Sequence, residues 1–335
     1  QRAAVLAANA AEDAAPAAGA VAAPPAATVA ETPASGGRQQ RSAKVTADLP
    51  IPAVAGLDRH VRDIPQLEEI WAYLNPQVLY RHHLGYKGNF ESDLAARVPR
   101  ALDLAEMVAG LKRQAAEFLR PRAVWQFFEA EPGGNAVHLF APGGQAPLHT
   151  FRFQRQDRPD GLCLADYVLP PRSGHRDHVA LFVVTAGAGV RQRADAARAA
   201  GRYVESHGLQ VLALETAEAA AEWLHRRLRE DWGFPDPPEL TMKQRFTSRY
   251  RGKRYAFGYP ACPNIDDQAG LWKLLRPEEI GVTLTEGMMM EPEASTSAIV
   301  FHHPACVYFS VSDEAAGRAV AVGYTPGQAP AMAKP

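Results

Sequence analysis

The sequence predicts an α+β fold, in which a single domain holds a mainly antiparallel twisted sheet flanked by helices, with a disordered Ala/Pro-rich linker before it. Segments with strand patterns follow one another from residue 122 to residue 185, and helical patterns then follow one another from 190 to 231. Runs of strands kept apart from runs of helices are typical of α+β folds, because parallel sheets alternate strand with helix. The sequence shows no internal repeats.

The first 48 residues have a low-complexity composition. Nineteen of them are Ala, several Pro are interspersed, and the first aromatic residue of the chain is Trp71. Such a segment cannot bury enough apolar surface to offset the entropy lost on ordering. We therefore predict a linker over residues 1–48, a folded domain over 49–328 and a flexible tail over 329–335.

Helical spacing first appears in residues 101–119, where Leu104, Val108, Leu111 and Ala115 recur on one face. Strands are then predicted over 122–130, 135–141, 148–155 and 178–185. Within this stretch Phe151 and Phe153 alternate with Arg152 and Gln154, as in a half-buried strand.

Two helices are predicted next, over about 190–206 and 212–231. The second carries an apolar stripe with Glu218 and Glu222 on its flank. A short helix over 269–275 follows, and three strands close the domain: they are expected near 281–285, 297–302 and 305–311.

Composition excludes several classes of partner. The 36 basic and 37 acidic side chains give a net charge of −1, so there is no electrostatic footprint for nucleic acid or a membrane surface. No apolar run approaches the length of a membrane span. Three scattered cysteines are too few for a disulfide framework, which favours a reducing, cytoplasmic location.

The most informative segment runs from Arg254 to Pro263, with the sequence RYAFGYPACP. Gly258 lets a ligand approach the backbone closely, and Pro260 and Pro263 each fix a φ angle. A guanidinium at the start of this stiff loop suits a carboxylate, which it can bind through two hydrogen bonds. The residues indicate a rigid loop for a ligand with a carboxylate and a flat ring.

This motif, Arg-x-x-x-Gly-Tyr-Pro-Ala-Cys-Pro, resembles the signature of the S-adenosylmethionine-binding reactivation module of cobalamin-dependent methionine synthases. The resemblance covers roughly residues 50 to 312 and implies the module's α+β fold. It extends to segments on both sides of the loop: Leu67–Tyr73, Ala220–Phe234, Leu284–Glu286, Phe301–Pro304 and Val307–Phe309.

The resemblance also implies a set of residues that bind S-adenosylmethionine. Arg254 would bind the methionine carboxylate, Tyr259 and the backbone around Ala261 the adenine and ribose, and Glu218 and Tyr308 would face the ligand. The loop residues Gly258, Pro260 and Cys262 complete this set.

Two positions depart from the family pattern. Asn75 falls where relatives have Asp and is included among the predicted ligand contacts, because an amide still accepts a hydrogen bond. Ser248 replaces a carboxylate found in some relatives. Both changes remove a negative charge from the expected site.

By resemblance, the module presents S-adenosylmethionine to cobalamin that is bound by a separate module. A flavodoxin-like donor supplies the electron that returns oxidised cobalamin to its nucleophilic state, and the methyl group is then transferred from the sulfonium. The chain lacks the Gly-Cys-Cys zinc motif and the Asp-x-His-x-x-Gly cobalamin motif of the other modules. We therefore expect a reactivation module of methionine biosynthesis, either a fragment or a separate subunit, with no catalytic acid or base.

Two other functions stay open on the sequence. The stretch Val183–Val190 leads through two glycines into a helix, as in a Rossmann-type methyltransferase, although Gln192 stands in place of the third glycine. A non-catalytic docking module for a flavodoxin-like partner would need a basic face, for which there are candidates: Arg226, Arg227, Arg229, Arg249, Arg251, Lys253 and Arg254.

Metal and thiol chemistry are not predicted. Cys262 has no neighbouring base in the sequence, so we interpret it as a packed residue rather than a nucleophile. The adjacent pairs His82-His83 and His302-His303 lack the spacing that puts two ligands on one helix face.

Overall fold

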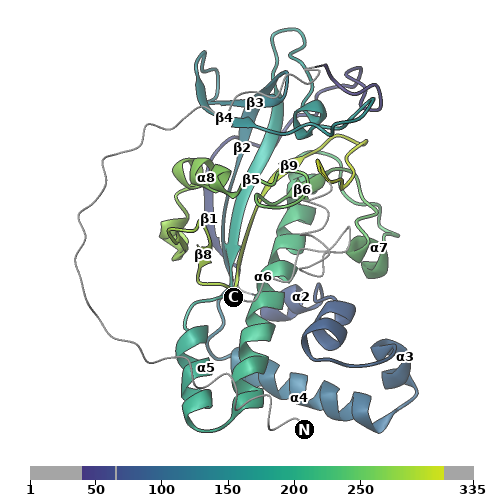
Figure 1. Cartoon of the computed structure of the whole chain (residues 1–335), viewed down its shortest axis with the longest axis vertical. Coiled ribbons are helices and arrows are strands. Elements are labelled where there is room, and N and C mark those ends of the chain that lie inside the picture. The colour runs from purple at the N-terminus through teal and green to yellow at the C-terminus, as the bar shows by residue number, and fades with distance from the viewer. Residues whose placement is uncertain (1–39, 65, 313–335) are drawn as a thin grey trace, which may run out of the picture. The chain divides into compact units, whose positions relative to one another are not determined.

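The computed structural model describes residues 40–64 and 66–312, and its central feature is a seven-stranded sheet (Figure 1). Every pairing in the sheet is antiparallel, which confirms the predicted fold class. The strands lie in the order β4 (Pro147–Arg152), β3 (Ala136–Phe140), β2 (Arg122–Gly133), β5 (Asp177–Thr185), β9 (Ser295–Phe301) and β6 (Lys253–Tyr255), while β1 (His60–Asp63) pairs with the start of β2.

Strand β5 is apolar on both faces because the sheet is covered on both sides. Alternate side chains of a strand point to opposite faces, so β5 contributes to two cores. One core, which includes residues of α6 (Tyr203–Asp231), contains Ala180, Phe182 and Val184. The other, which includes residues of α8 (Gln268–Leu275), contains Val179, Leu181 and Val183.

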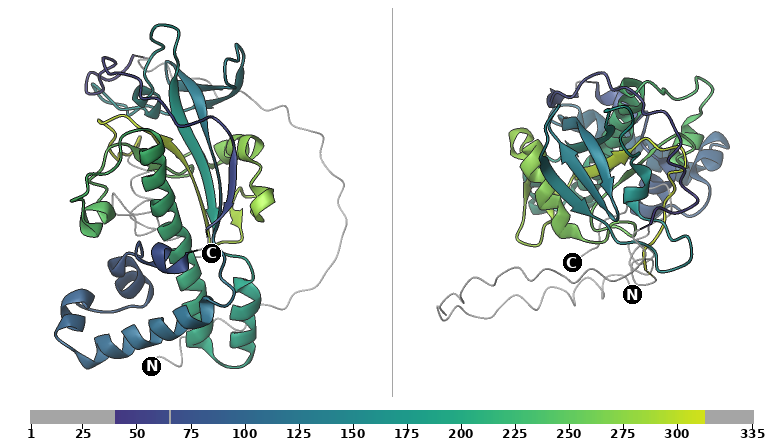
Figure 2. Two further views of the ribbon diagram at one scale, coloured as in Figure 1. Left: turned by 180° about the vertical axis from the view of Figure 1, so that it is seen from behind. Right: turned by 90° about the horizontal axis from the view of Figure 1, so that it is seen from above.

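Figure 2 shows α6 running along one side of the sheet and α8 lying on the other. The remaining helical elements gather mainly around α6 and its ends (Figure 1). They are α2 (Leu67–Trp71), the π-helix η2 (Gln77–His83), α3 (Phe90–Ala95), α4 (Pro99–Ala115), α5 (Val190–Ala199) and α7 (Met242–Phe246). Short 3-10 turns lie at Leu164–Tyr167, Ile265–Asp267 and Pro277–Ile280, and β7 (Thr283–Leu284) pairs with β8 (Met290–Glu291).

Helix α6 carries three acidic side chains that lie at or near the candidate site. Its apolar stripe, including Leu224 and Leu228, is buried against the sheet as the spacing predicts. Glu215, Glu218 and Glu222 follow one another at spacings of three and four residues, which places them on one face of the helix. This packing places Glu218 near Thr296 of β9 and Glu222 near Arg254 of β6, whereas Glu215 faces His83 of η2.

Two predicted elements differ in the structure. The break between the two helices lies at residues 200–202, so residues 203–211 already belong to α6. Residues 305–311 do not form the predicted strand, because β6 occupies the edge of β9. Their backbone groups find other partners: Tyr255 Oη donates to the Val307 carbonyl at 2.8 Å, and the Val311 amide donates to the Pro260 carbonyl at 2.9 Å.

The predicted linker boundary at residue 48 is also shifted. Ser42 and Val45 are only 3% and 2% exposed, and the Arg41 guanidinium donates to the carbonyls of Asp166 and Val168. Residues 40–48 therefore belong to the folded region. The rest of the predicted linker and the predicted tail lie outside the described residues. Within the described ranges, no helix combines the length and the apolar character needed to cross a membrane.

Candidate functional site

Strand β6 brings Arg254 opposite helix α6. In the antiparallel pairing of β6 with β9, Arg254 lies across from Val300, which belongs to the core on the α6 side of the sheet. The neighbouring Tyr255 belongs to the core on the other side. Strand alternation therefore points the Arg254 side chain toward α6, where only 15% of it is exposed.

The Arg254 guanidinium forms an ion pair with Glu222 of α6, and its Nη1 also donates to Tyr250 Oη at 3.4 Å. Tyr250 Oη in turn donates to Glu222 Oε2 at 3.0 Å. Burial alone would lower the pKa of Arg254, but the Glu222 carboxylate raises it, and the net direction is upward. The guanidinium is thus fixed and permanently charged before any ligand arrives.

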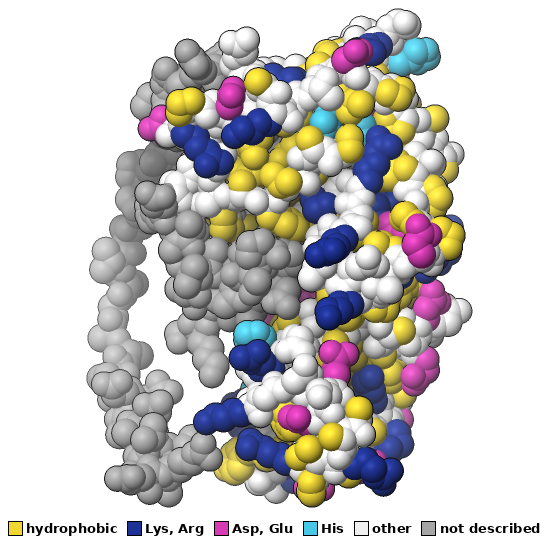
Figure 3. Space-filling model, turned by 90° about the vertical axis from the view of Figure 1, so that its right-hand side faces the viewer, with side chains coloured by type: hydrophobic (Ala, Val, Ile, Leu, Met, Phe, Trp, Pro, Cys, Tyr) yellow, Lys and Arg dark blue, Asp and Glu magenta, His cyan; other side chains and the backbone are white. Residues whose placement is uncertain are grey.

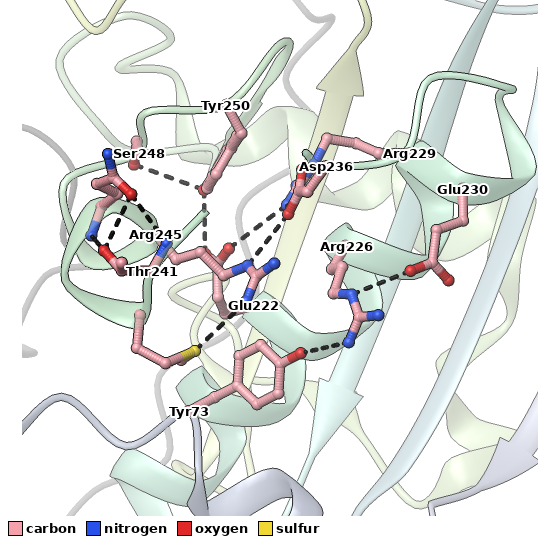
Figure 4. A network of polar contacts seen from close by, with 12 residues as sticks. Tyr73, Glu222, Arg226, Arg229, Glu230, Asp236, Thr241, Arg245, Ser248 and Tyr250 are labelled. Atoms are coloured by element: carbon pink, nitrogen blue, oxygen red, sulfur yellow. Dashed lines mark hydrogen bonds and ion pairs between the residues drawn. The ribbon is translucent and has the colours of Figure 1, made fainter. Parts of the chain in front are cut away.

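A second set of charged residues lies next to Glu222 (Figure 4). Arg229, which is 1% exposed, donates to both oxygens of Asp236 at 2.6 and 2.7 Å and lies 3.9 Å from Glu222 Oε1. Arg245 donates to the same Asp236 at 3.1 Å. The Arg229 guanidinium also stacks on the Tyr250 ring at 3.8 Å. Alternating charges therefore run from α7 through α6 to Arg254.

Glu218 lies one turn before Glu222 on α6. Its side chain is partly exposed, but its Oε2 atom is buried and has no hydrogen-bond partner among the described residues. Burial raises the pKa of Glu218 to about 7, with Arg254 opposing the shift and Glu215 adding to it. An unpaired buried carboxylate oxygen is costly, so this atom can accept a hydrogen bond or face a cation.

Hydrogen bonds between its own backbone groups close the loop that follows β6. The Gly258 amide donates to the Cys262 carbonyl at 2.9 Å, and the Cys262 amide donates to the Tyr259 carbonyl at 2.8 Å. Gly258 has a φ of +85°, which a residue with a Cβ rarely adopts, and it is exposed. Pro260 and Ala261 are buried, whereas Tyr259 is partly exposed. Two backbone hydrogen bonds and two prolines therefore restrain the conformation of the loop.

Tyr308 lies beside the Arg254 cluster. Its ring is 5.5 Å from that of Tyr255, and burial raises its pKa, with Arg254 opposing this shift and Glu222 adding to it. Ser248 is 8% exposed, and its Oγ lies 3.5 Å from Tyr250 Oη. The structure thus gathers Glu218, Arg254 and Tyr308 in one place, next to the loop that contains Tyr259.

Asn75 is the predicted site residue that the structure ties least to the others. It lies at the start of η2, and its Oδ1 accepts from the Gln77 amide at 3.0 Å. Among the described residues, no hydrogen bond links Asn75 to Glu218 or Arg254. Its contact with a ligand therefore stays a prediction from the family resemblance.

The cysteines have no catalytic surroundings. Cys262 and Cys306 are 2% and 3% exposed, and burial raises the pKa of both thiols, that of Cys306 to about 12. Cys262 Sγ donates to the Ala256 carbonyl at 3.0 Å. In the part of the chain that is described, no three His, Cys, Asp or Glu residues are placed to hold a metal ion.

The structure rules out the Rossmann-type reading of Val183–Val190. Strand β5 is antiparallel to both of its neighbours, whereas a Rossmann fold needs a parallel sheet. The glycines have a packing explanation instead: a Cβ on Gly187 would lie 2.5 Å from the Pro292 side chain, and Gly189 begins α5 with a φ of +72°.

Glu222 and Tyr250 are the site residues that sequence reasoning missed. Glu222 lies four residues after Glu218, on the same helical face, and this spacing is a signal that the sequence contains. Tyr250 comes from the loop before β6, and no periodic pattern marks it. Its position follows only from how the chain folds back on α6.

A Tyr250→Phe change removes one hydroxyl and keeps the ring against Arg229. We expect the free energy of unfolding to fall by about 1.5 to 3 kcal/mol, because a buried carboxylate loses a hydrogen bond. Urea denaturation of this variant measures the loss. Tyr203→Phe is the control, because Tyr203 is 68% exposed and its change should alter stability by less than about 0.5 kcal/mol. Equal stability of both variants would show that Tyr250 does not hold Glu222.

Comparisons with known proteins show what the chain is similar to. Over 204 residues, the chain is 40% identical to methionine synthase of Mycobacterium tuberculosis and 38% identical to methionine synthase of Mycobacterium leprae. These alignments cover 56% of this chain and 17% of each relative, so the chain corresponds to a small part of their length.

A solved structure extends the comparison to the fold. The crystal structure of the MetH reactivation domain bound to AdoHcy matches with a TM-score of 0.73 and 27% identity, over 83% of this chain and 90% of that one. Residues 95–317 match the family described as vitamin B12 dependent methionine synthase, activation domain. The chain therefore belongs to the family of activation domains of vitamin B12-dependent methionine synthase.

Proposed function

We propose that this chain binds S-adenosylmethionine and presents its methyl group for the reductive remethylation of oxidised cobalamin held by a separate module. The observation that carries this proposal is Arg254, a fixed guanidinium that stands beside an unpaired carboxylate oxygen of Glu218 and before a rigid loop. A ligand with a carboxylate, an ammonium, a sulfonium and a flat base matches these groups. The relative solved with AdoHcy, the demethylated counterpart of this ligand, supports the choice.

Each part of the ligand has a candidate partner. Arg254 binds the carboxylate, and Tyr259 with the backbone at Ala261 contacts the adenosine. Glu218 and Glu222 face the positive charges, and Tyr308 closes the site beside Arg254. Asn75, Gly258, Pro260 and Cys262 complete the proposed set, the last three by shaping the loop.

These side chains contribute positioning rather than proton transfer. Bound cobalamin supplies the nucleophile and the electron donor supplies the reducing equivalent. The methyl group leaves a sulfonium, and the bonding electron pair stays on sulfur as a neutral thioether, so no general acid is needed. Holding donor and acceptor in line and keeping water away are what the protein can add.

Methyl transfer in trans tests this function. The chain is mixed with the cobalamin-binding module of a methionine synthase in its oxidised state, a reduced flavodoxin, and S-adenosylmethionine with a labelled methyl group. We expect label to appear on cobalamin only when the chain and the reductant are both present. Equal labelling without the chain would contradict the proposal.

Ligand affinity should depend on pH through Glu218. The groups that face it are Glu215 and Glu222 of α6, Arg254 of β6, Thr296 of β9 and Tyr259 of the loop. Because the pKa of Glu218 is raised to about 7, a cationic ligand must displace its proton at lower pH. Affinity should rise about tenfold from pH 6 to pH 7.5, with proton release on binding. Calorimetric titrations in two buffers measure both quantities, and a flat profile in the wild type would contradict the assignment.

The free energy of unfolding of the chain without ligand should fall as pH rises, whereas the ligand affinity should increase. The pKa of Glu218 is higher in the folded chain than in the unfolded chain, so the unbound fold loses stability as pH rises from about 4.5 to about 7. Glu218→Gln should remove this part of the dependence, which makes it the control for both pH experiments.

A flavodoxin-like partner remains part of the proposal, with a reduced set of candidate contacts. Arg229, Lys253 and Arg254 of the predicted basic face are internal, because their charges are engaged inside the fold. Arg227 and Arg249 are exposed. Lys and Arg side chains occur over the whole height of the face in Figure 3. Weaker labelling in the transfer assay for Arg227→Glu with Arg249→Glu, at unchanged ligand affinity, would support docking here.

A further inference from the structure

His225 of α6 is a buried imidazole to which the proposed function assigns no role. It is 0% exposed, and neither of its ring nitrogens has a hydrogen-bond partner among the described residues. Its ring meets the ring of Tyr250 edge to face, with 5.2 Å between the two centroids. An aromatic ring is only a weak hydrogen-bond acceptor, so at least one nitrogen of His225 has no polar partner in this part of the chain. A buried polar group of this kind calls for a partner, because leaving it unpaired is costly.

Two neighbouring side chains on α6 also carry unpaired buried atoms. Glu222 lies three residues before His225 and Arg229 lies four residues after it, spacings that place all three side chains on one face of the helix. Glu222 Oε1 and Arg229 Nη1 have no hydrogen-bond partner among the described residues. Arg229 Nη2 lies 3.9 Å from Glu222 Oε1, which is beyond hydrogen-bond distance. One helix face therefore presents an acceptor, an imidazole and a donor that are all unsatisfied within the described ranges.

The charges around His225 determine which ligand suits these atoms. Burial lowers the pKa of His225 well below its ordinary value, and three cations add to this shift: Arg229, Arg254 and Lys253. The imidazole is therefore neutral, with one donor nitrogen and one acceptor nitrogen. An anion would meet the Glu222 carboxylate, and a cation would meet the three positive charges. Water both donates and accepts hydrogen bonds, so it suits a donor, an acceptor and a neutral imidazole at the same time.

We propose that Glu222, His225 and Arg229 bind internal water molecules, and that this water holds Glu222, and through it Arg254, in position. A buried water typically makes about three hydrogen bonds to polar groups that have no other partner. Glu222 Oε2 is bonded by Tyr250 and Arg254, whereas Oε1 faces Arg229. The water binds this second oxygen, so both ends of the carboxylate are fixed. His225 is thus a positioning residue that acts on the Arg254 guanidinium through water and Glu222.

A high-resolution crystal structure of the full chain tests the water site directly. We expect electron density for at least one water within hydrogen-bond distance of a His225 nitrogen and of Glu222 Oε1 or Arg229 Nη1. A second crystal soaked in bromide should show no anomalous signal at this place, because bromide scatters anomalously and water does not. Bromide bound there, or no density for any molecule between these three side chains, would overturn the proposal.

Replacing His225 with Leu tests the same site through stability. If water binds the imidazole, His225→Leu removes hydrogen bonds, and the urea midpoint should fall by about 0.5 to 1 M. A dry imidazole gives the opposite sign, because its removal also removes a desolvation cost. His225→Gln should recover most of the midpoint, since an amide both donates and accepts. His207→Leu is the matched control, because His207 is exposed on the same helix. A midpoint of His225→Leu at or above that of the wild type, or no recovery in His225→Gln, would overturn the proposal.

Ligand affinity reports the positioning role, and this readout alone rests on the proposed function. His225→Leu should weaken the binding of S-adenosylmethionine about fivefold, and His225→Gln should restore it to within about twofold of the wild type. Unchanged affinity in folded His225→Leu would overturn the positioning role. Absence of binding to the wild type is a different result, because it contradicts the proposed function, while the crystal structure and the urea midpoints still decide the water site. If His225→Leu does not fold, the wild-type crystals decide it alone.

Discussion

Replacing Arg254 with Ala should lower the affinity for S-adenosylmethionine by at least about a hundredfold, because the ligand carboxylate loses its hydrogen-bonded charge partner in a largely buried position. The fold should survive the change. Glu222 keeps the hydrogen bond from Tyr250 and the nearby charge of Arg229, and neither hydrophobic core includes Arg254. Arg254→Lys should recover only part of the affinity, because an ammonium cannot bind a carboxylate through a planar fork.

Calorimetric titration measures these affinities, and a thermal melt of each variant shows whether it is folded. Arg249→Ala is the matched control, since this arginine is exposed and lies in the same loop and strand segment. Its affinity should stay within about twofold of the wild type. If Arg254→Ala bound the ligand as tightly as Arg249→Ala, the carboxylate assignment would be wrong.

Replacing Arg229 with Ala should lower the free energy of unfolding by about 3 to 5 kcal/mol, because it breaks a buried ion pair and leaves charge uncompensated. Asp236 would keep only Arg245, Glu222 would lose a nearby cation, and the Tyr250 ring would lose the guanidinium stacked on it. Urea denaturation followed by circular dichroism measures the loss. An unchanged slope with denaturant would show that the denatured state is the same.

Arg226→Ala provides a control on the same helix, three residues away (Figure 4). Arg226 pairs with Glu230, and both side chains are more than a third exposed, at 39% and 36%. Arg226 also donates to Tyr73 Oη at 3.0 Å, a hydrogen bond that contributes about 1 kcal/mol. Exposed pairs contribute little, so the whole loss should stay below about 2 kcal/mol. Similar losses for the two variants would mean that the Arg229 network does not stabilise the fold.

The fold class followed from the sequence because long periodic segments carry most of the architecture. Strands β2 and β5 lie where apolar spacing predicts them, and α6 contains the helix predicted over 212–231 but begins at Tyr203. The short elements were missed or misplaced, since β1 and β6 have four and three residues and too little pattern. The strand expected at 305–311 had a suitable apolar sequence, but the edge it would need is taken by β6.

The part of the candidate site that lies in one continuous segment could be predicted from the sequence. Arg254 and the loop through Cys262 are adjacent in sequence, and their rigidity follows from two prolines and a glycine. Glu222 and Tyr250 could not be assigned in the same way, because their role depends on a contact between residues 28 positions apart. That Glu218 Oε2 has no hydrogen-bond partner among the described residues is also a property of the fold, since it depends on which atoms reach this oxygen.

A calorimetric titration of the intact wild-type chain with S-adenosylmethionine shows directly whether this chain binds the ligand. We expect saturable binding at one site, with release of a proton near pH 6.5, because Glu218 has a pKa of about 7 before binding. Absence of any binding at millimolar ligand would contradict it, because the fixed guanidinium of Arg254 and the carboxylate of Glu218 would then not form a site for this ligand.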